Sequence, residues 1–360
     1  MNDRERFQAC MHFKETDRPP FYEWLNFWQE TVNRWRGEGL PADANHYEYF
    51  GFDKKEGLGI DFGPIPSYVT RVIQEDDRYT VTESTGGGLR WVAKSLKAGT
   101  TIPQFMEFGV KTPEDFEKIR DRYDPNDMRR YPKNWSPELM EYYREIDHPV
   151  GIYLPGLFGN ARNMIGLKNL ILMIFKHPDF VKELFNFLAD FQVKAASKAL
   201  SEAKIDFANI WEDMAYHSGP HISPQQWREF MLPGYRRITG FLKEHGVDVI
   251  MVDSDGNNDA ITPCFLEGGV NCLFPLEVAS NEDALRLRKE YGHRLLIVGN
   301  IDKRALARGG AALENEVHSK LPFMIEDGGY IPSVDHCVSS DISFQNYSRY
   351  IELVKGYWNS

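Results

Sequence analysis

Short runs of apolar residues recur through the second half of the chain, and each gives way to a longer stretch with helical spacing. Strands of this kind, alternating with helices, are typical of a parallel sheet covered by helices. The pattern therefore predicts an α/β fold, and a (β/α)8 TIM barrel accounts for it best. The expected strands lie at 148–156, 206–215, 248–256, 269–278, 294–302 and 329–336, with a seventh in PPFYEW at 19–24 and an eighth hidden within 40–66.

An open, doubly wound sheet is the alternative architecture. No G-x-G-x-x-G or G-x-x-x-x-G-K-[ST] motif opens any helix, so the nucleotide-binding form of that fold is not indicated. Helix starts are marked by a capping side chain followed by proline or acidic residues at Thr112, Ser136 and Ser223, and another helix is expected from Asn281 to Gly292.

A different pattern occupies about residues 66–110. Apolar and polar residues alternate there, and Gly86-Gly87-Gly88 interrupts them. Alternation with period two and a glycine turn predicts an antiparallel β-meander. We interpret it as an insertion into one barrel domain that spans residues 1–360.

Composition narrows the function. Among 360 residues, 42 are Lys or Arg and 53 are Asp or Glu, a net charge of −11. The acidic balance argues against nucleic acid or a membrane surface as partner, since both require clustered positive charge. No apolar run reaches the ~18–20 residues of a membrane span, and the charged N-terminus is unlike a signal peptide. Four cysteines without CxxC spacing favour free thiols in the cytoplasm.

Polar side chains follow most of the predicted strands. Active sites of such barrels form at the carboxyl ends of the strands, so these side chains are expected to converge. Catalytic roles are predicted for Asp213, Asp253 and His336. Contacts with a substrate are predicted for Glu23, Trp24, Asn26, Phe158, Asn160 and Glu212.

Two chemistries fit this carboxylate-rich group. Asp253, Asp255, Glu277 and His336 offer oxygen and imidazole ligands for a divalent metal, with zinc as one choice. Alternatively, crowded carboxylates raise one pKa and perform metal-free acid/base catalysis. A structural role is equally open for Asp255, because polar residues after strands often cap helices or turns.

Several segments together resemble the uroporphyrinogen decarboxylase superfamily, which also contains cobalamin-dependent methyltransferases. They are RERFQACMHFKETDRPP, GLPADANHYEYFGFD, EDMAYHSGPHISPQQWREFMLPGYRRI, LLIVGNIDKRAL and GGYIPSVDHCVSSDISFQNYSRYIEL. The resemblance covers nearly the whole chain. It implies a (β/α)8 barrel with its site at the carboxyl-terminal mouth, and a homodimer.

The chain departs from both branches of that superfamily. Decarboxylases carry an arginine-rich RQAGRY-type segment after the first strand, whereas FYEWLNFWQ stands at 21–29. Zinc methyltransferases carry His-x-Cys-Gly and a later Cys, where this chain has Asp253-Ser254-Asp255-Gly256 and His336. The resemblance therefore suggests demethylation of a small O- or N-methyl donor, with cobalamin carried by a partner corrinoid protein. A metal-free decarboxylase and a non-catalytic barrel that binds a ligand or a corrinoid protein are the alternatives.

Overall fold

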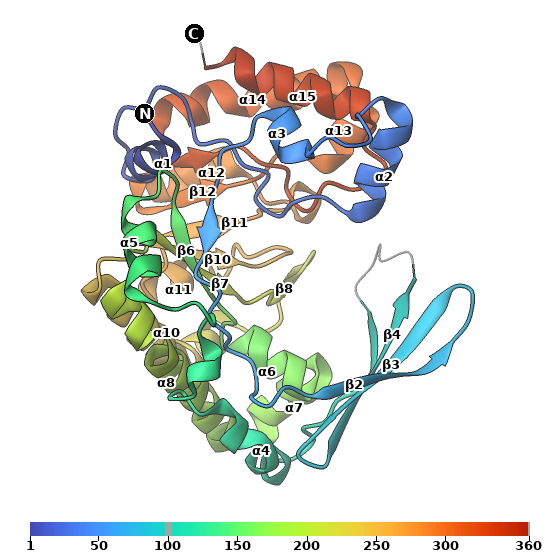
Figure 1. The fold of residues 1–360 in the computed structure, drawn as a ribbon, viewed down its shortest axis with the longest axis vertical. Coiled ribbons are helices and arrows are strands. Elements are labelled where there is room, and N and C mark those ends of the chain that lie inside the picture. Colours follow the sequence, from blue (N-terminus) through green and yellow to red (C-terminus); the bar gives the residue numbers. More distant parts are fainter. Residues whose placement is uncertain (98–102, 359–360) are drawn as a thin grey trace.

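A curled parallel sheet forms the centre of the molecule in the computed structural model, which describes residues 1–97 and 103–358 (Figure 1). Its seven strands are hydrogen-bonded in the order β1-β6-β7-β10-β11-β12-β13. Their bounds are Glu56–Gly57, Val150–Leu154, Phe207–Trp211, Val249–Asp253, Cys272–Phe274, Leu296–Val298 and Tyr330–Ile331. Sequence order and spatial order agree, as expected where each parallel strand is followed by a crossover.

Helices cover the outer face of this sheet. The longest, α8 (Pro178–Glu202), packs against α10 (Leu232–Glu244). The predicted caps at Thr112, Ser136 and Ser223 are confirmed, but the helix expected from Asn281 begins at Ala284 with Asp283 as its cap. The other helices are α1 (Asp3–Met11), α2 (Gln29–Glu38), α3 (His46–Phe50), α4 (Pro113–Arg120), α5 (Pro137–Glu145), α6 (Phe158–Ile165), α7 (Leu167–Lys176), α9 (Pro224–Phe230), α11 (Thr262–Glu267), α12 (Ala284–Tyr291), α13 (Lys303–Arg308), α14 (Gly310–Asp327) and α15 (Phe344–Gly356).

The extended run at 19–24 is not a regular strand, which corrects the sequence-based prediction. It lies between β1 and the segment after β13, where an eighth strand would close the curl. The amide of Asp53 donates to the carbonyl of Phe21 at 2.8 Å, but the amide of Trp24 donates to the hydroxyl of Ser333 at 3.0 Å. A side chain thus replaces the main-chain partner of a ladder. The strand expected within 40–66 is β1, and a fully closed barrel stays a prediction.

An apolar cluster fills the inside of the curl. Helix α1 covers the end of the sheet where the strands begin, since Phe7 packs on Phe207 with ring centroids 5.5 Å apart and Arg4 is paired with Asp206 at 3.0 Å. Ligands therefore reach the interior from the carboxyl ends of the strands. The cluster comprises Phe7, Met11, Tyr22, Trp24, Phe207, Val249, Met251, Cys272, Phe274, Leu296, Val298 and Ile331.

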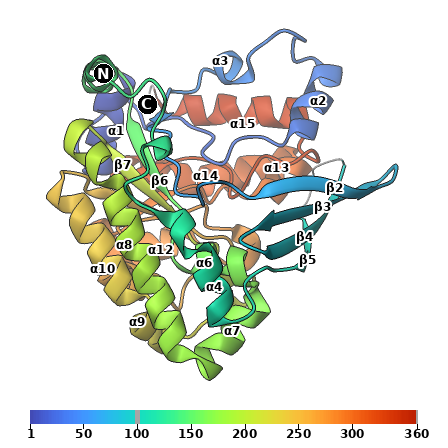
Figure 2. The ribbon, with the colours of Figure 1, turned by 60° about the horizontal axis from the view of Figure 1, so that its bottom comes forward.

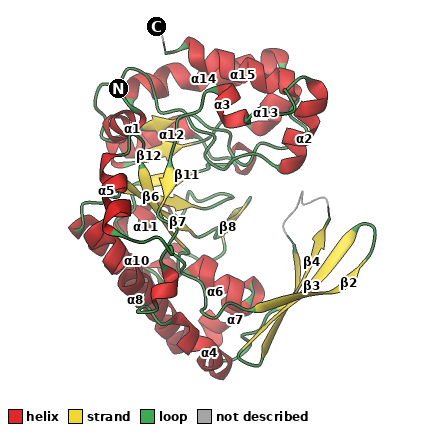
Figure 3. Ribbon diagram, viewed as in Figure 1, coloured by secondary structure: helices red, strands yellow, loops and turns green. Residues whose placement is uncertain are grey.

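The predicted meander is confirmed as a separate antiparallel sheet, β2-β3-β4-β5 (Val69–Glu75, Tyr79–Gly86, Leu89–Leu96, Gln104–Glu107). It stands apart from the parallel sheet as an arm (Figures 2 and 3). Gly87 and Gly88 make the two-residue turn between β3 and β4. Their φ angles are 61° and 75°. Glycine adopts such angles without strain. Within the described part of the chain, no helix combines the length and the apolar character needed to cross a membrane.

Candidate active site

The register of three adjacent strands places Asp253 inside the curl. Asp253 ends β10 and is paired with Trp211 on β7 and with Phe274 on β11. Side chains alternate along a strand. Asp253 therefore shares its face with Val249 and Met251, which belong to the interior cluster.

The surroundings of Asp253 favour the neutral form of its carboxyl group. Burial raises its pKa well above the ordinary value, and the charges of Asp255 and Asp213 raise it further. His336 opposes the shift but does not reverse it. Desolvation and two neighbouring carboxylates favour the protonated form of a carboxyl group, so Asp253 is placed to act as an acid.

His336 is paired with Asp255. Its Nε2 lies 3.3 Å from Oδ2 of Asp255, and the hydrogen bond to Asp255 is the largest cause that raises the pKa of His336 to about 10. The imidazole is therefore a cation at neutral pH and cannot accept another proton. The second oxygen of Asp255, Oδ1, is buried and has no hydrogen-bond partner within residues 1–97 and 103–358. It is a buried acceptor whose hydrogen-bonding capacity is unused.

Glu277 is neutralised by a partner from the next strand–helix unit. Its Oε1 lies 2.9 Å from Nζ of Lys303, and its Oε2 accepts the amide of Gly256 at 3.0 Å. Among the residues that the structure describes, no three His, Cys, Asp or Glu side chains are grouped to hold a metal ion. As placed, Asp255 is paired with His336 and Glu277 with Lys303, and a metal site made of Asp253, Asp255, Glu277 and His336 stays a prediction.

Asp213 and Arg162 form one side of the mouth. Nη2 of Arg162 lies 2.8 Å from Oδ2 of Asp213, and the guanidinium is 5.1 Å from the ring of Trp211. Asp213 has a positive φ of 43°. This conformation is strained for a residue other than glycine. Nδ2 of Asn160 is buried in the same helix, α6, without a hydrogen-bond partner among the described residues.

Two predicted site residues with carboxylates lie inside the walls of the site. Glu212 is fully buried and accepts the amides of Leu157 and Gly159 at 2.8 and 2.9 Å and the hydroxyl of Tyr235 at 2.8 Å. These bonds attach the start of α6 to the end of β7. Glu23 is also buried and is held by Ser333, Val334 and Tyr347. As placed, both carboxylates position the elements around the site.

The remaining predicted contacts are divided between core and surface. Phe158 is fully buried against the ring of His221, so it belongs to the packing of α6. Trp24 belongs to the interior cluster. Asn26 has a positive φ of 65°, and its Oδ1 accepts the hydroxyl of Tyr47 at 3.1 Å. Asn26 also borders a separate cavity, which is described below.

Two polar residues inside the curl were missed by the sequence reasoning. Tyr153 on β6 and Asn209 on β7 are adjacent in register. Tyr153 is 42% exposed although it lies in the middle of the sheet, and Oδ1 of Asn209 is buried without a partner among the described residues. Tyr153 therefore borders open space within the curl, and Asn209 lies beside it in register. The signal was present, because each interrupts an apolar strand, GIYLP and FANIW.

Fold and site together define an α/β protein with a carboxyl-rich mouth at the ends of its parallel strands. The sequence profile of the family "Uroporphyrinogen decarboxylase (URO-D)" matches residues 80–357, and the chain belongs to that family. A solved methyltransferase from Methanosarcina mazei has a similar fold, with a TM-score of 0.64, 15% sequence identity and 99% of each chain covered. No curated protein matches the chain. Family membership indicates an enzyme.

Proposed function

We propose that this protein is a methyltransferase that demethylates a small methyl ether. The observation that carries the proposal is the position of Asp253 at the end of β10, inside the curl, where desolvation and the charges of Asp255 and Asp213 raise its pKa. An ether oxygen is a poor leaving group unless it is protonated, and a buried carboxylic acid supplies that proton at neutral pH. The structural likeness to a methyltransferase agrees with this class of reaction.

The reaction breaks the bond between the methyl carbon and the ether oxygen. The bonding electrons stay on oxygen, which takes the proton of Asp253 and leaves as an alcohol. Asp253 then recovers a proton from solvent. A reduced corrinoid, carried by a partner protein, would be the nucleophile that accepts the methyl group.

Other residues of the mouth influence the protonation of Asp253. The carboxylates Asp213 and Asp255 keep Asp253 protonated before the reaction. His336, a cation paired with Asp255, stabilises the negative charge that Asp253 acquires when it has given up its proton. Oδ1 of Asp255 and Nδ2 of Asn160 are a buried acceptor and a buried donor without partners among the described residues.

Decarboxylation is the second candidate, and the family assignment favours it. Asp253 would then protonate the carbon from which carbon dioxide has left. A porphyrinogen with many carboxylates is disfavoured, because the mouth carries Asp213, Asp255 and Glu277 and the chain has a net charge of −11. A smaller acid with a single carboxylate meets less repulsion.

The test is the methylation of cob(I)alamin by 2-methoxyphenol under anaerobic conditions. The reaction is measured as the change in absorbance of the corrinoid. We expect methylation by the wild type and a loss of about 10²–10⁴-fold in rate for Asp253→Asn, which cannot donate the proton. Lys14→Met, an exposed change at the opposite end of the barrel, is the control. Methylation by 2-methoxyphenol at equal rates in wild type and Asp253→Asn would refute the acid role of Asp253. Carbon dioxide release from small acids without any methyl transfer would favour the decarboxylase.

A further inference from the structure

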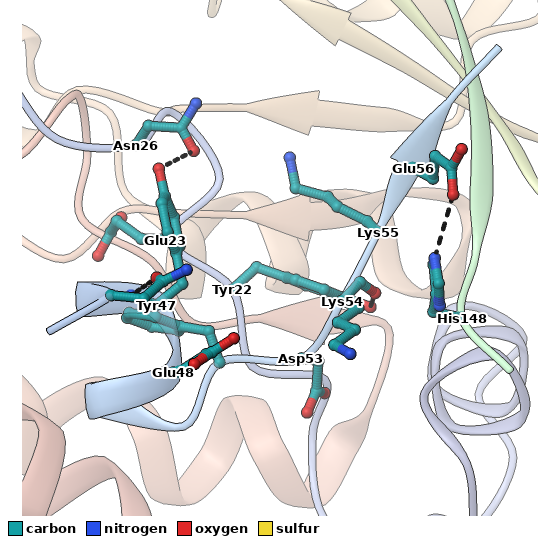
Figure 4. A pocket seen from close by; sticks show the side chains of 12 residues that line it. Tyr22, Glu23, Asn26, Tyr47, Glu48, Asp53, Lys54, Lys55, Glu56 and His148 are labelled. Atoms are coloured by element: carbon teal, nitrogen blue, oxygen red, sulfur yellow. Dashed lines mark hydrogen bonds and ion pairs between the residues drawn. The ribbon is translucent and has the colours of Figure 1, made fainter.

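A cavity opens beside the barrel, between the segment 22–26 and β1. Its volume is about 410 Å³. Sites for small molecules have volumes of this order. Figure 4 shows Lys55 extending into the cavity between Asn26 and Glu56. The lining residues are Tyr22, Glu23, Asn26, Asn45, Tyr47, Glu48, Phe52, Asp53, Lys54, Lys55, Glu56 and His148.

The ammonium group of Lys55 has no carboxylate partner within residues 1–97 and 103–358. Its Nζ lies 4.4 Å from the centroid of the Trp24 ring. This cation–π contact leaves the hydrogen-bond donors of the ammonium unused. Burial lowers the pKa of Lys55 to about 8. A protonated, partly desolvated ammonium without a counter-ion is unfavourable, and an anionic ligand would relieve that cost.

The nearby carboxylates are already engaged elsewhere. Arg18 binds Asp53 through two nitrogens, at 2.5 and 2.9 Å. Glu56 accepts the hydroxyl of Tyr142 at 3.0 Å and lies 3.5 Å from Nε2 of His148. Glu23 is bound by the donors described above, and Glu48 is exposed to solvent. Lys55 therefore faces the cavity as a cation among anions that do not neutralise it.

We propose that this cavity binds a small organic carboxylate, with Lys55 as the residue that holds its charge. The carboxylates of Glu48, Asp53 and Glu56 in the lining repel a second negative charge, so a monoanion is favoured over a phosphate dianion. Tyr22, Tyr47 and Phe52 supply apolar walls that suit an organic body. The proposal does not depend on the reaction at Asp253, because it uses none of the mouth carboxylates.

The experiment compares benzoate with benzamide, which has the same shape and no charge, by titration observed with ligand NMR. We expect the wild type to bind benzoate at least tenfold more tightly. Lys55→Met should weaken benzoate binding by about 10- to 100-fold, the worth of a charged hydrogen bond, and leave benzamide unaffected. Lys55→Arg should retain most of the affinity.

The matched control is Lys289→Met, which removes an exposed lysine of α12 outside the lining and should change neither affinity. Equal binding of benzoate and benzamide by the wild type would overturn the proposal without the need for any variant. Unchanged benzoate binding by folded Lys55→Met would also overturn it. Inorganic phosphate that binds more tightly than benzoate would contradict the preference for an organic monoanion.

Discussion

Replacement of Glu23 by glutamine should change how the stability of the protein depends on pH. Burial raises the pKa of Glu23 from 4.5 to about 7, with its three hydrogen bonds opposing the shift. The folded state therefore binds this proton more tightly than the unfolded state. The stability that the neutral carboxyl contributes is fully present below pH 4.5 and is lost as the pH rises through 7.

The size of the effect follows from the two pKa values. Each unit of difference corresponds to about 1.4 kcal/mol, so charging Glu23 costs about 3 kcal/mol above pH 8. Between about pH 5.5 and 8.5 the cost grows by about 2 kcal/mol. Glu23→Gln, which stays neutral, should lack this part of the pH dependence.

The assay is urea unfolding of wild type and Glu23→Gln at both pH values. Glu282 and Asp335 also have raised pKa values, about 7 and about 6, and contribute with the same sign. The difference between the two proteins cancels those contributions. We expect the free energy of unfolding of Glu23→Gln, relative to that of the wild type, to be about 2 kcal/mol greater at the higher pH than at the lower pH. A constant difference would show that Glu23 is charged throughout, and the reasoning about its burial would fail.

Three further outcomes are expected. Gly156 has a φ of +71°, and a Cβ there would lie 2.4 Å from the carbonyl oxygen of Trp211. Gly156→Ala should therefore lower the free energy of unfolding in urea by about 2 kcal/mol or more, and no loss would contradict this close approach. Arg4→Met should cost about 3–5 kcal/mol by the same assay, because it leaves the buried Asp206 without its ion pair. A cost below about 1 kcal/mol would argue against that pairing. Asp253→Asn should leave the melting temperature unchanged or raise it, because the surroundings of Asp253 favour its uncharged form, and a fall of several degrees would indicate an ionised, paired carboxylate.

The sequence predicts the parts of this fold that depend on local pattern. Apolar runs locate β7 and β10, alternation locates the arm, and capping residues locate helix starts such as Ser223. PPFYEW was wrongly predicted as a strand, because its main chain is bound by a side chain, Ser333, more than 300 residues away. Rules that use only neighbouring residues cannot predict a partner so far away in the sequence.

The site also has features that follow from the local sequence pattern and features that depend on the folded surroundings. The position of Asp253, at the end of a strand, follows from pattern alone, and its proximity to Asp255 and His336 follows from the barrel. The pairing of Glu277 with Lys303 and the burial of Glu212 depend on which neighbours fill the space around them. The sequence did not predict a binding role for Lys55. That role depends on the lack of a carboxylate partner among the described residues, which only the folded structure reveals.

The Ser333–Trp24 hydrogen bond has a consequence for synthesis on the ribosome. The amide of Trp24 emerges 309 residues before its partner. Translation at ~5–20 residues per second delays their meeting by about 15–60 s. Throughout that interval Tyr22 and Trp24, which finally lie inside the curl, have no completed interior to enter. The nascent N-terminal segment is thus an exposed aromatic stretch for most of its synthesis, the kind of sequence that a chaperone at the tunnel exit protects.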